Sequence, residues 1–287
     1  MKRLLSIGFT MLSTLVFSQQ VISTEEYTNA FSNTYWTRVL GHDESGYYLL
    51  RESGPISTKT IILEKYSPAL KLLFAKNIEA TTGIWNDARY HKYTELSNGK
   101  VYIFLDGWNK EKQESSCYVQ QVLDDGTLAT DIKILETESA SSQSKAPNYV
   151  ISFSPDGSKL AVLTEKTYEK ESKEKLRLKV YNSADLSPLW SKDLTLENAA
   201  ERGPNNSLVV DNNGTTYLFK DIRISRKQHQ YQVLAVGKDL YKVSPINLDG
   251  YAPVQNKIQI RDWKINYRGY PWAPRTKKYR LPSDMVL

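Results

Sequence analysis

The sequence is nearly free of cysteine and poor in histidine. Cys117 is the only cysteine among the 287 residues, so no disulfide can form within the chain and packing must stabilise the fold. The three histidines have no ligand-like spacing, and neither a Gly-x-Ser-x-Gly nor a His-Glu-x-x-His motif is present. We therefore predict no catalytic motif, no metal and no cofactor. We expect Cys117 to fill a buried position on a strand as a small apolar side chain.

Long apolar runs are absent beyond the N-terminus. Lys2 and Arg3 precede an apolar stretch, Leu4–Phe17, which ends in a pattern typical of signal-peptide cleavage. A membrane anchor is the alternative, but it needs about 20 apolar residues, and polar Gln19 arrives too soon. We therefore expect residues 1–18 to be a signal peptide and the remainder to be a soluble secreted or periplasmic protein without a transmembrane segment. The ending Phe-Ser-Gln-Gln resembles that of exported Bacteroidota proteins.

Long helical patterns are missing as well, whereas the chain contains 19 tyrosines, a residue enriched in strands. Four segments each place a polar turn with glycine before a short apolar strand, and their glycines are separated by 53, 58 and 57 residues. Between one glycine turn and the next, each repeat contains a second pair of apolar segments separated by turn residues, which predicts a second hairpin. The sequence therefore predicts an all-β fold of repeated four-stranded antiparallel units. The four glycines are Gly46, Gly99, Gly157 and Gly214.

One repeat carries a recognisable motif. Its residues Phe153–Val162 read FSPDGSKLAV, which resembles the repeat of WD40-like and TolB-type β-propellers. This resemblance implies a propeller of four-stranded blades, and it implies little about function because propellers carry many activities. It covers about residues 35–249, and we take residues 19–250 as the propeller-like domain.

The number of blades is left open by the sequence. Residues Lys257–Tyr267 alternate like the first strand of a fifth repeat, but Pro271, Pro274 and Pro282 interrupt the next expected strand. Residues 21–34 could complete a fifth blade, residues 251–287 could form an extension, or the chain could be a short relative of larger propellers. We favour closure with five blades, because a closed ring protects the sheet edges.

Two groups of aromatic residues are candidate binding sites. The first group lies on predicted links that share one end of the propeller, and it could contact a sugar or a peptide: Trp85, Tyr90 and Trp108. Packing between blades is the alternative role for these rings. The second group lies within residues 251–287, where eight basic residues face only two acidic ones. Its candidate ligand-binding residues are Trp263, Arg268, Tyr270, Trp272 and Arg275.

This basic and aromatic mixture is suited to an anionic polymer. We predict an exported, non-catalytic recognition or scaffolding module for a protein or an acidic glycan at the cell envelope, and we do not expect it to bind nucleic acid. One alternative is a propeller hydrolase or lyase whose site is assembled from several blades. Another is a regulatory propeller that acts on a separate catalytic chain.

Overall fold

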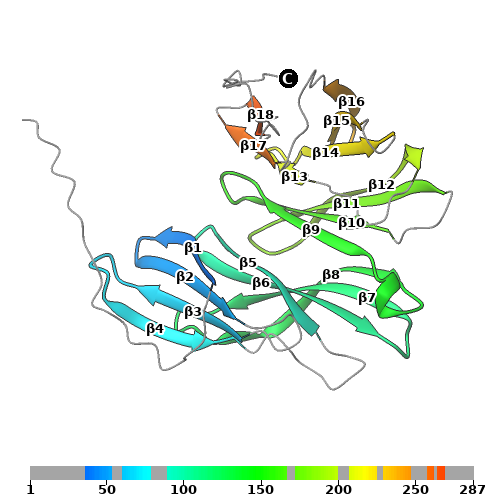
Figure 1. Ribbon diagram of the computed structural model, residues 1–287. Coiled ribbons are helices and arrows are strands. Elements are labelled where there is room, and N and C mark those ends of the chain that lie inside the picture. The colour runs from blue at the N-terminus through cyan, green and yellow to red at the C-terminus, as the bar shows by residue number, and fades with distance from the viewer. Residues whose placement is uncertain are drawn as a thin grey trace, which may run out of the picture.

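The computed structural model describes residues 36–53, 60–78, 89–166, 172–199, 207–224, 229–246, 257–261 and 264–268. Within these ranges the chain forms four four-stranded antiparallel sheets and one two-stranded sheet, each with its strands in chain order (Figure 1). The only helical segment among these residues is a short 3-10 turn, η2 (Gln143–Lys145). The predicted all-β fold is confirmed.

The sheets are numbered in chain order. Sheet 1 contains β1 (Trp36–Asp43), β2 (Gly46–Ser53), β3 (Thr60–Tyr66) and β4 (Leu72–Asn77). Sheet 2 contains β5 (Arg89–Ser97), β6 (Lys100–Asn109), β7 (Glu114–Val122) and β8 (Leu128–Ser139). Sheet 3 contains β9 (Asn148–Phe153), β10 (Lys159–Glu165), β11 (Lys173–Asn182) and β12 (Pro188–Ala199). Sheet 4 contains β13 (Ser207–Val210), β14 (Thr216–Arg223), β15 (His229–Val236) and β16 (Tyr241–Ile246), and sheet 5 contains β17 (Lys257–Arg261) and β18 (Lys264–Arg268).

The repeated glycines occupy equivalent places in the four large sheets. Gly46 opens β2 directly after the first turn of sheet 1, and the other three lie in the first turns of sheets 2, 3 and 4. These turns also touch one another, since the backbone N–H of Asp156 donates to Asn212 Oδ1 at 3.2 Å across sheets 3 and 4. The predicted repeat is therefore confirmed as one turn per sheet at the same end of each.

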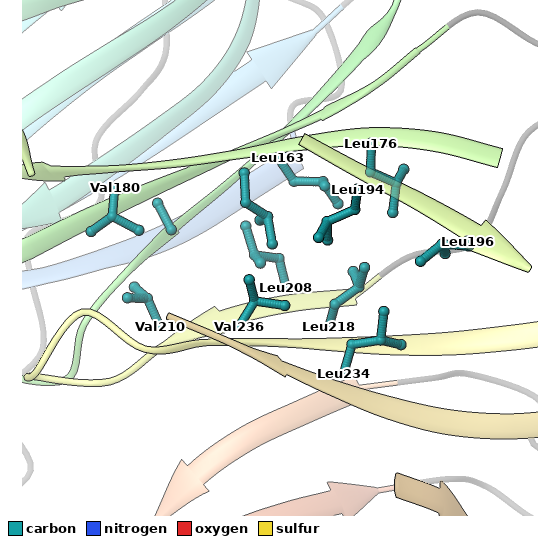
Figure 2. Packing of buried hydrophobic residues seen from close by; sticks show 12 residues of the cluster. Leu163, Leu176, Val180, Leu194, Leu196, Leu208, Val210, Leu218, Leu234 and Val236 are labelled. Atoms are coloured by element: carbon teal, nitrogen blue, oxygen red, sulfur yellow. The ribbon is translucent and has the colours of Figure 1, made fainter. Parts of the chain in front are cut away.

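Consecutive sheets pack face to face. Separate apolar clusters join sheet 1 to sheet 2, sheet 2 to sheet 3, and sheet 3 to sheet 4. Along β10, Leu160 and Val162 belong to the cluster with sheet 2, whereas Ala161 and Leu163 belong to the cluster with sheet 4 (Figure 2). This continuous apolar run is expected of a strand that is buried on both faces. The first strands also lie side by side, β1 with β5, β9 with β13, and β13 with β17, so the sheets are blades of a β-propeller.

Outer strands carry lysines that reach the next sheet. Lys133, on β8, donates through Nζ to the carbonyl oxygen of Asp185 at 2.6 Å, in the turn between β11 and β12 of sheet 3. Lys192 Nζ, on β12, donates to the carbonyl oxygens of Gly237 at 3.1 Å and Leu240 at 3.2 Å in sheet 4. Each lysine therefore ties the outer edge of one blade to a turn of the next blade.

We expect Lys192→Met to lower the free energy of unfolding by about 1 kcal/mol, because two charge-assisted hydrogen bonds at a partly exposed site are lost. Urea unfolding followed by fluorescence measures the change. Lys100→Met, at an exposed position, is the matched control and should change stability by less than about 0.5 kcal/mol. Equal losses in the two variants would contradict the role assigned to Lys192.

Two details of the sequence prediction are wrong. The stretch Lys257–Tyr267 is not one strand, because β17 and β18 pair antiparallel with Arg261 opposite Lys264. The predicted link at Trp108 is also shorter, because β6 continues to Asn109 and β7 begins at Glu114. Charged residues at strand ends still form backbone hydrogen bonds with the neighbouring strand. A prediction from polarity alone therefore makes the loop too long.

Candidate functional site

The topology divides each large sheet into two ends. Glycine turns lie at one end, together with the turns between third and fourth strands. At the other end the second strand stops, the third begins, and the fourth strand leaves toward the next sheet. We call this second end the linker end. It gathers the chain segments that vary most between repeats, and variable connections on a rigid scaffold are where function usually resides.

An acidic residue stands near the linker end of the second strand in every large sheet. Each is the cross-strand partner of a buried residue on the third strand. These acids were not among the predicted site residues, although each falls at the end of a repeated strand segment, and that position is the signal that could have revealed them. The four residues are Glu52, Asp106, Glu165 and Asp221.

The carboxylates of sheets 3 and 4 have partners within the chain. Glu165 Oε2 accepts a hydrogen bond from Asn148 Nδ2 at 2.6 Å. Asp221 Oδ1 lies 2.7 Å from His229 Nδ1, and the imidazole stacks nearly parallel on Tyr231, with ring centroids 6.2 Å apart. Burial, and then the nearby charge of Asp221, raise the pKa of the Tyr231 hydroxyl. Asp221 and His229 thus form a partly exposed pair in which the carboxylate orients the ring.

Ion pairs join sheets 2 and 3. Arg177 Nε lies 3.0 Å from Asp193 Oδ1 in its own sheet, and its guanidinium also donates to Glu138 on β8. Burial opposes the charge of Arg177, but the hydrogen bond to Asp193 and the charge of Glu138 outweigh it and raise the pKa of the guanidinium. Lys179 Nζ lies 3.2 Å from Glu136 Oε1. These charges are paired between blades, and the pairs hold sheet 2 against sheet 3.

Two tyrosines complete the same interface. Tyr149 Oη donates to the carbonyl oxygen of Ser115 at 2.8 Å, and Tyr181 Oη donates to that of Leu135. Burial raises the pKa of both phenols, and the charge of Glu136 adds to the effect at Tyr181. Both rings therefore act as neutral hydrogen-bond donors that connect the sheets. Cys117 is fully buried in the same cluster, as the sequence predicted.

Two of the three aromatic candidates lie on adjacent strands near the linker end of sheet 2. Trp108 lies on β6, half-buried, and its indole N–H donates to the carbonyl oxygen of Ala140 at 2.9 Å. Tyr90 lies on the neighbouring strand β5, opposite Asp106. Trp85 lies outside the described residues. The hydrogen bond fixes the indole of Trp108 within its own sheet, so this ring is a rigid surface rather than a mobile side chain.

Of the second group of candidates, only Arg268 falls within the described residues, as the last residue of β18. Trp263, Tyr270, Trp272 and Arg275 lie outside them. The register of sheet 5 places Lys257 opposite Arg268, Gln259 opposite Asn266, and Arg261 opposite Lys264. Because alternate residues and cross-strand partners share a face, these six polar positions fall on one face of the hairpin. The other face carries Ile258, Ile260, Ile265 and Tyr267.

Comparison with known proteins yields structural neighbours only. No family model and no curated protein matches the sequence. The β-propeller domain of the trilobed protease from Pyrococcus furiosus aligns with a TM-score of 0.49 at 10% identity, over 86% of this chain and 67% of that one. TolB from Acinetobacter baumannii aligns with a TM-score of 0.44 at 12% identity, over 81% and 49%. A GH43 endo-arabinanase from Bacillus licheniformis aligns with a TM-score of 0.39 at 10% identity, over 82% of this chain and 87% of that one.

Neither a metal centre nor a membrane-spanning helix is present in the described parts of the chain. No three His, Cys, Asp or Glu side chains gather there in a way that could hold a metal ion. Nor do these parts contain a helix of the length and apolar character needed to cross a bilayer.

Proposed function

We propose that this chain is a non-catalytic recognition module that binds an anionic partner through sheet 5 and the basic segment around it, residues 251–287. The observation that carries the proposal is the register of sheet 5, in which polar and mostly basic residues alternate with apolar ones along both strands. Four of the six polar positions on one face are Lys or Arg, and neither strand contains an acidic residue. Such a face attracts anions at long range and holds them by charge-assisted hydrogen bonds.

The apolar face of sheet 5 has a matching surface. On the side of sheet 4 away from sheet 3, Phe219, Tyr231, Val233 and Ile246 form a buried cluster. β17 lies beside β13, the first strand of that sheet. Sheet 5 therefore lies next to an apolar surface of sheet 4.

The setting of this partner is inferred from the N-terminal sequence. A signal peptide over residues 1–18 would deliver the propeller to the periplasm or the exterior, where it would meet acidic glycans and proteins of the cell envelope. Trp108 and Tyr90 at the linker end of sheet 2 would supply further contacts, because rigid aromatic rings offer large contact area at small entropic cost.

We expect the full chain to bind immobilised polygalacturonate at low salt and to elute as salt rises, because the attraction between exposed charges is screened. The variant Lys264→Gln/Arg268→Gln should bind roughly tenfold more weakly, since two charged contacts are removed. The affinity is measured by biolayer interferometry over a series of salt concentrations.

The control variant is Lys238→Gln/Lys242→Gln, which removes the same charge from exposed positions on sheet 4. It should keep nearly all of the affinity. If the two variants lose affinity equally, net charge rather than sheet 5 governs binding, and this proposal fails.

Catalysis is a second candidate function, favoured by one observation. The Asp221–His229 pair is partly exposed, and a carboxylate on Nδ1 prepares the other ring nitrogen to accept a proton. A hydrolase or lyase would use this pair with groups from other blades. Turnover of an acidic polysaccharide by the wild-type chain, lost in His229→Gln, would replace the recognition proposal with this one.

A further inference from the structure

Several hairpin turns of sheets 2, 3 and 4 share the local sequence for one covalent modification. A glycine that follows Asn or Asp leaves its backbone nitrogen sterically open, because it has no Cβ. This nitrogen can attack the side-chain carbonyl carbon of the preceding residue and close a cyclic imide. Which turn reacts then depends on how the fold holds the two groups. The turn dipeptides of this kind are Asn98-Gly99, Asp125-Gly126, Asp156-Gly157 and Asn213-Gly214.

In three of these turns the glycine N–H already donates to a backbone carbonyl oxygen. The nitrogen can attack only after this hydrogen bond is broken, so the bond slows the reaction. The acceptors are Leu123 for Gly126 at 2.9 Å, Ser154 for Gly157 at 2.8 Å, and Asp211 for Gly214 at 3.0 Å.

The two aspartate turns are protected a second time, because an ionised carboxylate resists attack by a nucleophile. Hydrogen bonds from Thr127 lower the pKa of the Asp125 carboxyl. Burial opposes the charge of Asp156, but hydrogen bonds from Ser154 and Ser158 outweigh it and lower its pKa. Both carboxyls are therefore ionised at neutral pH, and the asparagine turns are the ones left to react.

The turn at Asn98 differs from the other three. It is a two-residue hairpin with Ser97 opposite Lys100, and Asn98 and Gly99 have φ of +54° and +72°, as in a type I′ turn. Within the described part of the chain, the Gly99 N–H donates to no acceptor. The side chain of Asn98 is exposed. A Cβ at Gly99 would lie 4.0 Å from its nearest neighbour, Asp43 Cβ, so the turn also has room to rearrange.

We propose that Asn98 is a site of spontaneous deamidation, which reacts faster than Asn213 although glycine follows both. The nitrogen of Gly99 bonds to Cγ of Asn98, the bond from Cγ to the amide nitrogen breaks, and ammonia leaves with the proton of the glycine nitrogen. Water then opens the imide. Opening at Cγ gives aspartate, whereas opening at the α-carbonyl leaves the chain attached through the side chain and gives isoaspartate.

The modified turn lies against the first turn of sheet 3. The hydroxyl of Ser97 donates to the carbonyl oxygen of Gly157 at 3.3 Å, and a Cβ at Gly157 would lie 3.2 Å from the backbone nitrogen of Asn98. Both products add a negative charge here, and isoaspartate also adds a carbon to the backbone. Deamidation therefore changes the contact between the second and third blades as the protein ages.

The test incubates the full chain at neutral and mildly alkaline pH and follows each site by peptide mapping with mass spectrometry. We expect Asn98 to deamidate about fivefold faster than Asn213, because a hydrogen bond of ordinary strength holds the glycine nitrogen only at the second site. Both rates should rise with pH, since the deprotonated nitrogen is the nucleophile. Enzymatic methylation of isoaspartate identifies the rearranged product.

Two controls separate the fold from the local sequence. In guanidinium chloride, where the chain is unfolded, the two sites should react at nearly equal rates. In the folded chain, Asp211 Oδ1 accepts the backbone N–H groups of Asn213 at 2.9 Å and Thr215 at 2.8 Å. Asp211→Ala should therefore loosen this turn and raise the rate at Asn213 without changing the rate at Asn98.

Equal rates at the two sites in the folded wild type, or a faster reaction at Asn213, would overturn the proposal. So would an unmodified Asn98 after an incubation in which the unfolded chain reacts completely at both sites.

Discussion

Replacement of Lys220 by methionine is expected to lower the free energy of unfolding by about 3–5 kcal/mol, because it removes the cation paired with the buried carboxylate of Glu174. Lys220 Nζ, on β14, lies 2.6 Å from Glu174 Oε1, on β11, and the two side chains are only 3% and 6% exposed. Water cannot replace the lost charge at such a site. Urea unfolding of the wild type and of Lys220→Met measures the difference.

The double variant Glu174→Leu/Lys220→Met is the decisive control. It removes both charges and fills the space with apolar groups, so it should regain most of the stability that the single variant loses. If the single variant loses less than about 1 kcal/mol, Glu174 reaches solvent or another cation, and the pair contributes little to the contact between sheets 3 and 4.

This ion pair lies across the interface that Figure 2 illustrates. Leu163, Leu176, Leu218 and Leu234 supply apolar contact between sheets 3 and 4. Apolar contact is non-directional and allows one sheet to slide on the other. The Glu174–Lys220 pair has a fixed geometry, so it favours one register between the two blades.

The turns of the fold could be predicted from sequence because their causes are local. The glycines at positions 46, 99, 157 and 214 stand in hairpin turns whose backbone conformation depends on a few adjacent residues. The alternation of apolar and polar residues then identifies the strands, and strands joined by tight turns must pair antiparallel. The signature Phe153–Val162 falls on the end of β9, the first turn of sheet 3 and the start of β10, as its resemblance to propeller repeats implied.

Contacts between blades could not be predicted in this way. Lys192 and its acceptors are 45 and 48 residues apart in the chain, and Lys220 is 46 residues from Glu174. Nothing in a local pattern separates such a lysine from one that faces solvent. The hairpin β17–β18 resembles a single strand in sequence for a related reason, since a strand and a tight hairpin alternate alike until the pairing is known.

The candidate site was predicted only in part. The aromatic positions Tyr90 and Trp108 lie on the adjacent strands β5 and β6 rather than on links, and the antiparallel order of the strands decides which ends coincide. The basic composition of residues 251–287 was visible, but its arrangement as opposed pairs depends on the register of β17 and β18. Register is a property of the folded hairpin and is set by the turn that joins the strands.

The outer strands of sheets 3 and 4 differ at equivalent positions. On β16, Lys242 and Ser244 stand at the register positions that Trp190 and Lys192 occupy on β12 of sheet 3. Trp190 packs on the next sheet, with its indole N–H donating to the carbonyl oxygen of Gly214 at 3.0 Å. Such differences between repeats depend on which neighbour each outer strand faces, and the repeat pattern alone does not predict them.

The first turn of sheet 1 is expected to be the most sensitive of the four. Gly46 has φ of +150°, and a Cβ at this position would lie 1.8 Å from the carbonyl oxygen of Tyr66. The turn is also fixed by Asp43, whose carboxylate accepts the backbone N–H groups of Ser45 at 2.8 Å and Gly46 at 2.9 Å. Burial opposes the charge of Asp43, but hydrogen bonds from Ser45 and Tyr48 outweigh it and lower the pKa.

Gly46→Ala should therefore lower the free energy of unfolding by about 4 kcal/mol, because it combines an unfavourable φ with displacement of the backbone of the neighbouring turn. Gly99→Ala is the matched control. Its φ of +72° is also positive, but the nearest atom to a new Cβ is Asp43 Cβ at 4.0 Å, so only the conformational cost of about 1 kcal/mol remains. Urea unfolding of the two variants compares these costs directly. Equal destabilisation would show that sheet 1 can move its turns apart, and that the close approach at Gly46 does not hold the first blade together.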